Sequence, residues 1–237
     1  MDCAKASSAS RSLALINFKE YAHLVENHAL VEAMISSLRK FESSSELERE
    51  MVIGIIESTA CAFIGRGKQS NYCPNMDETL QLCIQELIEV VSTPHLPCRC
   101  LLRGLLALLR IGAAAGPGLS APGLFGVIAL ALRDGNEQCR EVAIQLLGQI
   151  SGAAAEESFK LCRRYLTDRN HVVRAAALRS LQGLPTSDPA LYPEAAAMLA
   201  DDYPRVRLEA LRLLGCLATR TPEALVRTNQ VYASPGW

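Results

Sequence analysis

The stretch LADDYPRVRLEALRLLGCLA, residues 199–218, decides the fold of this chain. It starts with the apolar end of one helix, passes through an acidic turn at Asp201, and enters a second apolar helix around Val206 and Arg207. The same arrangement occurs twice upstream, as LTDRNHVVRAAALRSLQGL at residues 166–184 and as LRDGNEQCREVAIQLLGQIS at residues 132–151. Three such copies indicate an internal repeat.

The three copies share an aspartate in the turn, an arginine six residues later and an alanine three residues after the arginine. These positions are Asp134, Asp168 and Asp201; Arg140, Arg174 and Arg207; and Ala143, Ala177 and Ala210. The arginines are 34 and then 33 positions apart, and a fixed period of this size is typical of stacked helical repeats. We therefore predict an all-α fold, a right-handed α-solenoid of about five helical hairpins.

The composition agrees with helices packed on helices. Hydrophobic residues make up 49% of the chain and aromatic residues only 5%. No run of eighteen apolar residues lacks a charge, so we expect no contact with a membrane. The net charge of −1 argues against a chain that binds polyanions as a whole. The nine cysteines lie mostly within apolar helical patterns, which predicts free thiols in a reducing compartment.

The periodicity predicts a repeat array over residues 21–219. Its hairpins are expected at about 24–64, 76–112, 120–151, 155–184 and 189–219. Ser45 and Glu48 form a predicted capping box, and GRGKQSNYCPN at residues 65–75 is a predicted polar loop. Residues 1–20 are expected to be a partly disordered lead-in. The tail at 220–237 lacks the period, and we expect it to mark a truncation, with the chain a fragment or isoform of a longer protein.

The repeated aspartates and arginines are interpreted as structural. An aspartate in the turn can cap the second helix of its hairpin. The arginine six residues later can reach the aspartate of the adjacent copy, which would give a ladder of ion pairs along the stack. The predicted ladder consists of Asp134, Asp168, Asp201, Arg140, Arg174 and Arg207.

A second row lies five residues after each ladder arginine, at Gln145, Arg179 and Arg212. This offset places it on another face of the second helices, away from the core leucines. One interpretation is a partner surface for an acidic protein, RNA phosphate or a polyphosphate. The alternative is an ordinary solvated helix face.

The sequence offers no catalytic motif. None of the four histidines lies in HExxH or is followed by Glu, and neither a P-loop nor a dinucleotide fingerprint is present. The strongest metal candidate is Cys98-x-Cys100 with His95 and Cys73, but residues two apart do not share one helix face. We therefore predict no enzyme, no cofactor and no metal.

The Asp-x-x-x-x-Val-Arg pattern, with small residues in the helix that follows, resembles HEAT repeats. The order of MDETLQLCIQ, LLALLRIG, CREVAIQLLGQIS, VVRAAALRSLQGL and MLADDYPRVRLEALRLL is similar to the amino-terminal HEAT region of the Integrator subunit 4 family. That resemblance implies a nuclear scaffold for small nuclear RNA and nascent transcript cleavage. It also implies protein partners: a β-CASP nuclease, its inactive homologue and other Integrator subunits.

Two other functions are compatible with the sequence. One is a HEAT or armadillo-type adaptor in trafficking or nuclear transport. The other is an enzyme with a metal site that the sequence does not reveal.

Overall fold

The structure is a computed structural model that describes residues 17, 28–39, 45–70, 76–93, 95–115, 123–150, 152–184, 188 and 190–220. The predicted lead-in and tail therefore lie outside the described residues, apart from Asn17 and Arg220. Within the described part the chain forms α- and 3-10 helices and no strand, which confirms the predicted all-α solenoid class. The chain divides into two compact units, Met1–Ala131 and Leu132–Trp237.

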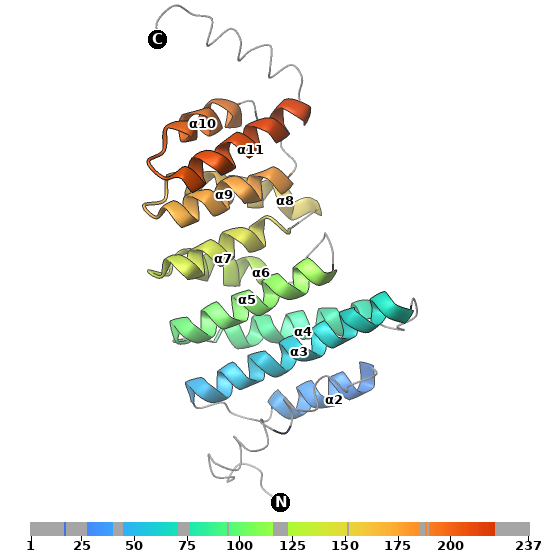
Figure 1. Ribbon diagram of the computed structural model, residues 1–237. Helices are drawn as coiled ribbons and strands as arrows, with labels where there is room; N and C mark the ends of the chain where they lie inside the picture. Colours follow the sequence, from blue (N-terminus) through green and yellow to red (C-terminus); the bar gives the residue numbers. More distant parts are fainter. Residues whose placement is uncertain are drawn as a thin grey trace, which may run out of the picture. The chain divides into compact units, whose positions relative to one another are not determined.

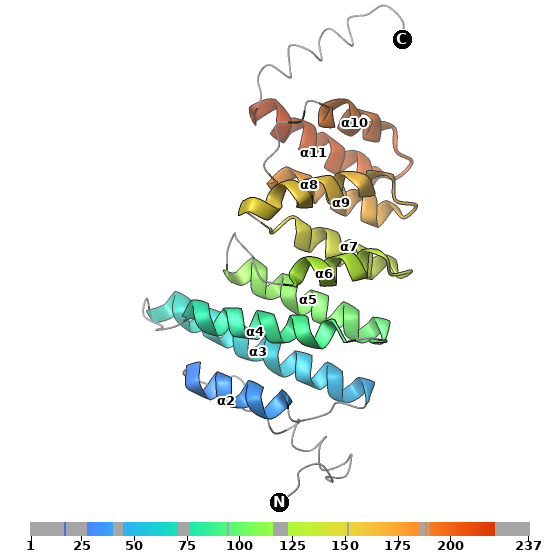
Figure 2. The same ribbon diagram turned by 180° about the vertical axis from the view of Figure 1, so that it is seen from behind.

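The first unit contains the helices α2 (His28–Arg39), α3 (Glu46–Ser70), α4 (Met76–Val91), α5 (Cys98–Ala115) and α6 (Leu124–Leu132). The last residue of α6 belongs to the second unit. Helices α3, α4 and α5 pack against one another (Figure 2). Helix α2 buries one side, Val31, Met34, Ile35 and Leu38, at the spacing of an amphipathic helix.

Helix α3 begins with the predicted capping box. The Ser45 hydroxyl accepts from the Glu48 amide at 3.2 Å, and the Ser45 amide donates to the Glu48 carboxylate at 3.4 Å, which confirms this prediction. The helix then continues to Ser70, so the predicted loop over residues 65–75 is wrong for residues 65–70. GRGKQS contains good helix formers, and Pro74 is the first residue beyond it that breaks a helix.

Helices α4 and α5 approach each other closely at Gly104, a buried position on α5. A Cβ atom built on Gly104 would lie 2.2 Å from Cγ2 of Val91, the last residue of α4. Only glycine fits there without movement of the valine. This contact sets the separation of the two helices in the hairpin.

The second unit contains α7 (Glu137–Leu147), η3 (Gly152–Ala154), α8 (Ala155–Arg164), η4 (Tyr165–Thr167) and α9 (His171–Gly183), followed by α10 (Leu191–Ala197), η5 (Met198–Ala200) and α11 (Pro204–Arg220). Helix α9 packs against α7 on one side and α11 on the other (Figure 1). Ala143, Ala176, Ala177 and Ala210 are buried along these helices, and their small side chains permit the close stacking. Among the helices described, none has the length and hydropathy needed to cross a membrane.

The close approach at Gly104 leads to a prediction about stability. Gly104→Ala should lower the free energy of unfolding by about 1–3 kcal/mol, because the added methyl group overpacks against Val91. The matched control is Gly65→Ala in α3, where an added Cβ meets nothing within 4 Å. This control should be neutral or should stabilise by about 0.5–1 kcal/mol. Urea unfolding measures both, and equal midpoints for the two variants would contradict the role of Gly104.

Candidate functional site

The most regular polar structure in the second unit lies in the turns between the two helices of each hairpin. Asp134 accepts from the Asn136 amide and Asp168 accepts from the Asn170 amide, each at 2.8 Å. Asp201 accepts from the Tyr203 amide at 3.0 Å. Each carboxylate therefore bends the chain two residues ahead of it, as in an Asx turn.

The predicted capping role of the aspartates is wrong for α7 and α9. The N-cap residues are Asn136 and Asn170, whose side-chain oxygens accept from the amides of Gln138 and Val172 at 2.8 Å. The aspartates shape the turn that leads to these caps. The signal for the caps was present in the sequence, because asparagine two residues after the aspartate is a preferred N-cap residue.

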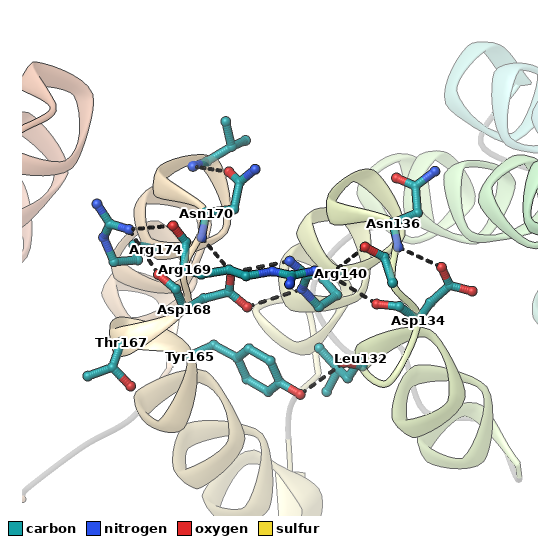
Figure 3. Close-up of polar contacts among 12 residues, drawn as sticks. Leu132, Asp134, Asn136, Arg140, Tyr165, Thr167, Asp168, Arg169, Asn170 and Arg174 are labelled. Carbon is teal, nitrogen blue, oxygen red and sulfur yellow. Dashed lines mark hydrogen bonds and ion pairs between the residues drawn. The ribbon is translucent and has the colours of Figure 1, made fainter.

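The ladder arginines extend from one hairpin to the next. Arg140 donates from Nε and Nη2 to the two carboxylate oxygens of Asp168, at 3.1 and 3.3 Å. Arg174 does the same to Asp201, at 2.8 and 2.9 Å. Figure 3 shows the guanidinium group of Arg140 directed at Asp168. Both contacts are bidentate, the geometry that makes arginine–carboxylate pairs strong and directional.

Each arginine also binds the turn of its own hairpin. Nη1 of Arg140 donates to the carbonyl oxygens of Asp134 and Gly135, at 3.0 and 3.1 Å (Figure 3). Nη1 of Arg174 donates to the carbonyls of Asp168 and Arg169, at 2.9 and 3.3 Å. One guanidinium group thus fixes the backbone of one turn and the carboxylate of the next.

Burial makes these pairs different from ordinary surface ion pairs. The side chains of Arg174 and Asp201 are 14% and 8% exposed. The hydrogen bond from Arg174 holds the pKa of the Asp201 carboxyl below its ordinary value, and the same bond raises the pKa of Arg174. Next to this pair, the rings of His171 and Tyr203 stack at 3.8 Å between centroids and are nearly parallel.

Arg207 occupies the ladder position in α11 but makes only half of these contacts. Its Nη1 donates to the carbonyls of Asp201 and Asp202, at 2.8 and 3.0 Å. Within the described part of the chain, its Nε and Nη2 atoms pair with no carboxylate. The structure thus brings Arg140 to Asp168 and Arg174 to Asp201, and among the residues it describes no aspartate side chain pairs with Arg207.

The predicted partner row is engaged within the protein. Arg179 and Arg212 both donate to Oε1 of Glu209, at 2.7 and 3.0 Å, and the Glu209 side chain is only 2% exposed. Gln145 donates to Glu141 at 3.2 Å. Burial tends to raise the pKa of Glu209, but the hydrogen bonds from Arg179 and Gln182 outweigh it, and the pKa is lowered.

Buried glutamates paired with arginines also occur in the first unit, and the sequence reasoning missed this class of contact. Glu57 on α3 is paired with Arg110 at 2.6 Å and Arg103 at 3.3 Å, both on α5. Glu86 on α4 is paired with Arg39 on α2 at 2.7 Å. A glutamate on the apolar side of a helical pattern was the available signal, because a buried carboxylate requires a partner.

Cys100, one of the predicted metal candidates, is a weak metal ligand in this structure. Cys100 lies near Glu46 and Glu50, but burial first and these carboxylates second raise the pKa of its thiol, which favours the protonated form. Glu50 is paired with Arg99 at 2.7 Å. Burial likewise raises the pKa of Cys83 to about 12. Of the other predicted candidates, Cys73 lies outside the described residues, and His95 is exposed with φ 59°.

Comparison with known proteins identifies the class. Residues 126–215, which carry the aspartate turns and the ladder arginines, match the family model of HEAT repeats. This match and the all-α stack agree with a helical-repeat protein, and repeats of this family generally mediate contacts between proteins. The expected resemblance to HEAT repeats is thus confirmed for these residues.

The chain is also similar to a protein of known name. The chain is 29% identical over 111 residues to human Integrator complex subunit 4, a match that covers 40% of this chain. The same match covers 11% of the human protein, so the chain spans a small part of that relative's length.

The buried ladder leads to a prediction for Arg174. Arg174→Ala should lower the free energy of unfolding by about 3 kcal/mol, because it leaves the buried Asp201 carboxylate without its guanidinium partner. Arg169→Ala is the matched control. Arg169 is exposed, and this change should stay within about 0.5 kcal/mol. Urea unfolding at neutral pH compares them, and equal losses would show that the ladder adds no stability.

The lowered pKa of Asp201 predicts a dependence on pH. A carboxyl whose pKa is lower in the folded protein stabilises that state above its unfolded pKa, near 3.8, and loses this contribution as the pH falls through the folded value. Urea midpoints should therefore fall on acidification more in the wild-type chain than in Asp201→Asn. Parallel pH profiles for the two proteins would argue against a functioning Arg174–Asp201 pair.

The contacts of Glu209 reverse one expectation from the sequence. A solvated row would allow Arg179→Ala plus Arg212→Ala without loss of stability. The structure instead predicts a loss of about 1–2 kcal/mol, because the buried Glu209 carboxylate keeps only Gln182. Adding Glu209→Gln should restore much of the loss. Thermal melting measures the series, and an unchanged double variant would restore the solvated-face interpretation.

Proposed function

We propose that this chain is a non-catalytic HEAT-repeat scaffold of a nuclear complex that processes RNA 3′ ends, of the Integrator type. The observation that carries the proposal is the likeness to human Integrator complex subunit 4. In this proposal the chain supports a β-CASP nuclease and its inactive homologue, and it contacts other Integrator subunits. The nuclease partner cleaves small nuclear RNAs and nascent transcripts, and this chain acts in the nucleus without cofactor or metal.

The second unit suits a scaffold because its repeats are held in register by polar contacts as well as by apolar packing. In our proposal, Asp134, Asp168, Asp201, Arg140, Arg174 and Arg207 form the structural ladder of an array of five hairpins, at about 24–64, 76–112, 120–151, 155–184 and 189–219. Bidentate pairs allow little change in the spacing of neighbouring turns. Such an array offers partners a surface of fixed geometry.

The outward row of Gln145, Arg179 and Arg212 is our proposed partner surface. The two arginines share Glu209, so the row carries little net positive charge. A protein with a few matching carboxylates fits this surface better than RNA, whose binding relies on many unpaired cations. A direct contact with RNA is therefore secondary in the proposal.

Affinity purification tests the function. The tagged chain, recovered from nuclear extract and analysed by mass spectrometry, should bring the β-CASP nuclease and its inactive homologue. A reproducible set of vesicle-coat or transport proteins without this pair would favour the trafficking or nuclear transport adaptor instead. The tag alone serves as the background control.

The partner surface needs a variant that keeps the fold. Gln145→Ala plus Arg212→Ala leaves Glu209 bonded to Arg179 and Gln182, so the melting temperature should change little. Recovery of the partners should fall severalfold. The matched control is Arg164→Ala. It removes an exposed arginine from α8, the first helix of the hairpin whose second helix, α9, carries Arg179. Equal recovery with both variants would remove this row from the proposal.

A further inference from the structure

A groove lies between α3 and α5, two helices that pack side by side within the first unit (Figure 1). Its volume is about 380 Å³, and its lining residues belong to these two helices. Helix α2 packs on α3, and α6 follows α5 in the chain, so the groove does not lie at an end of the described array.

Apolar side chains gather in this groove. Leu47 and Met51 of α3 line it together with Leu102 and Leu106 of α5, and we name these four residues the apolar lining. Leu47 is 63% exposed, and the other three are half-buried. Single exposed leucines are common on protein surfaces, but apolar side chains that gather in one concave place are typical of a binding site.

Gly54 of α3 leaves space within the groove. A Cβ atom built on Gly54 would lie 3.9 Å from Nη2 of Arg103, an ordinary van der Waals distance, and would meet no other side chain of the described residues within 4 Å. Glycine weakens a helix interior relative to alanine. Helix α3 bears that cost without the steric need seen at Gly104, and what the glycine provides is room for a side chain from outside.

Arginines give the groove a positive charge. Arg99 and Arg103 line it, and Arg110 lies about two turns further along α5. Glu50 pairs with Arg99 at 2.7 Å. Glu57 pairs with Arg103 at 3.3 Å and with Arg110 at 2.6 Å. Three cations against two carboxylates leave one positive charge.

The arginines are also more accessible than the glutamates. The side chains of Arg99 and Arg103 are 78% and 46% exposed, whereas those of Glu50 and Glu57 are 21% and 9% exposed. A guanidinium group has five N–H donors, and one carboxylate accepts from at most two of them in the bidentate geometry. The outward donors can therefore bind a carboxylate that comes from outside.

We propose that the groove between α3 and α5 docks an amphipathic helix of another protein, one whose apolar row is flanked by aspartate or glutamate. The apolar row lies on the apolar lining and over Gly54, and the flanking carboxylates accept from Arg99 and Arg103. Recognition of a helix in a groove uses this combination of apolar anchors and charged flanks. RNA fits less well, because Glu50 lies among the cations that a phosphate would need.

Selection from a peptide library tests the chemistry of the occupant. Each displayed peptide has about 16 residues, keeps leucine at the i, i+3, i+4 and i+7 spacing of one helix side, and varies Glu, Lys and Ser beside it. The peptides are selected for binding to the full chain and against binding to its Gly54→Leu variant. We expect enrichment of peptides rich in Glu. No enrichment, or enrichment of basic or neutral peptides, would overturn the proposal.

Fluorescence anisotropy with an enriched peptide then locates the contact. Gly54→Leu should weaken binding by about tenfold or more, because the leucine fills the groove. Its melting temperature should hold or rise, since leucine is the better helix former. Gly65→Leu is the matched control on the same helix, because a Cβ atom there meets nothing within 4 Å, and it should bind like the wild-type chain.

A second variant keeps the test independent of the glycine. Leu47→Ser should weaken binding severalfold at an unchanged melting temperature, because Leu47 is largely exposed. Leu130→Ser is its control, at a leucine of α6 that is 48% exposed outside the groove. Equal affinity for the wild-type, Gly54→Leu and Leu47→Ser chains would overturn the proposal.

The charged contact is tested separately. Arg103→Gln should weaken binding by about tenfold, the loss expected for hydrogen bonds to a charged group. The fold should hold, because Glu57 keeps its pair with Arg110. With a peptide in which Gln replaces Glu, Arg103→Gln should have little further effect, as a double-mutant cycle requires. An undiminished effect on that peptide would contradict the carboxylate contact.

Sedimentation velocity of the full chain without peptide separates a second copy of the chain from another protein. We expect a monomer. A dimer that Gly54→Leu dissociates would assign the groove to self-association and would also overturn the proposal. The inference does not rest on the proposed function, and none of these outcomes bears on which proteins the chain recovers from nuclear extract, so the two proposals fail separately.

Discussion

The second unit depends on the bidentate pair between an arginine at the start of one helix and the aspartate in the turn of the next hairpin. Arg174 serves two backbones at once, because Nη1 holds the carbonyls of its own turn while Nε and Nη2 hold Asp201. Apolar packing alone would allow neighbouring alanine-rich helices to shift along one another, because small side chains interlock little. The guanidinium group removes that freedom, since a slip breaks several hydrogen bonds in a site that is mostly closed to water.

Buried glutamates perform a related task on the helices themselves. Glu57, Glu86 and Glu209 are all nearly inaccessible, and each takes at least one arginine from a neighbouring helix. These carboxylates are costly to bury, so each is tolerated only when the neighbouring helix brings its arginine to the right place. They therefore favour one arrangement of neighbouring helices over others of similar apolar contact. This selectivity is what a scaffold of fixed geometry requires.

The sequence was sufficient to predict the all-α solenoid, because the apolar helix pattern recurs in three copies. The turn aspartates and ladder arginines could be located because they recur with the same period. It was insufficient for contacts that depend on which helix sides meet. Arg179 and Arg212 look like a solvated row until Glu209 is seen beneath them. The N-caps at Asn136 and Asn170 were not predicted, because the aspartate two residues earlier is also a preferred N-cap residue. Residues 65–70 are helical because no strong breaker precedes Pro74.

The ladder also gives the stack a polarity. In the described residues both ladder pairs run in the same direction, from Arg140 to Asp168 and from Arg174 to Asp201, so the two sides of the hairpin formed by α8 and α9 are not equivalent. A contact of this kind is heterologous, which means that an added unit extends the row without closing it. Whatever adds to such a row must present the acidic side, and a hairpin turned end for end would set arginine against arginine.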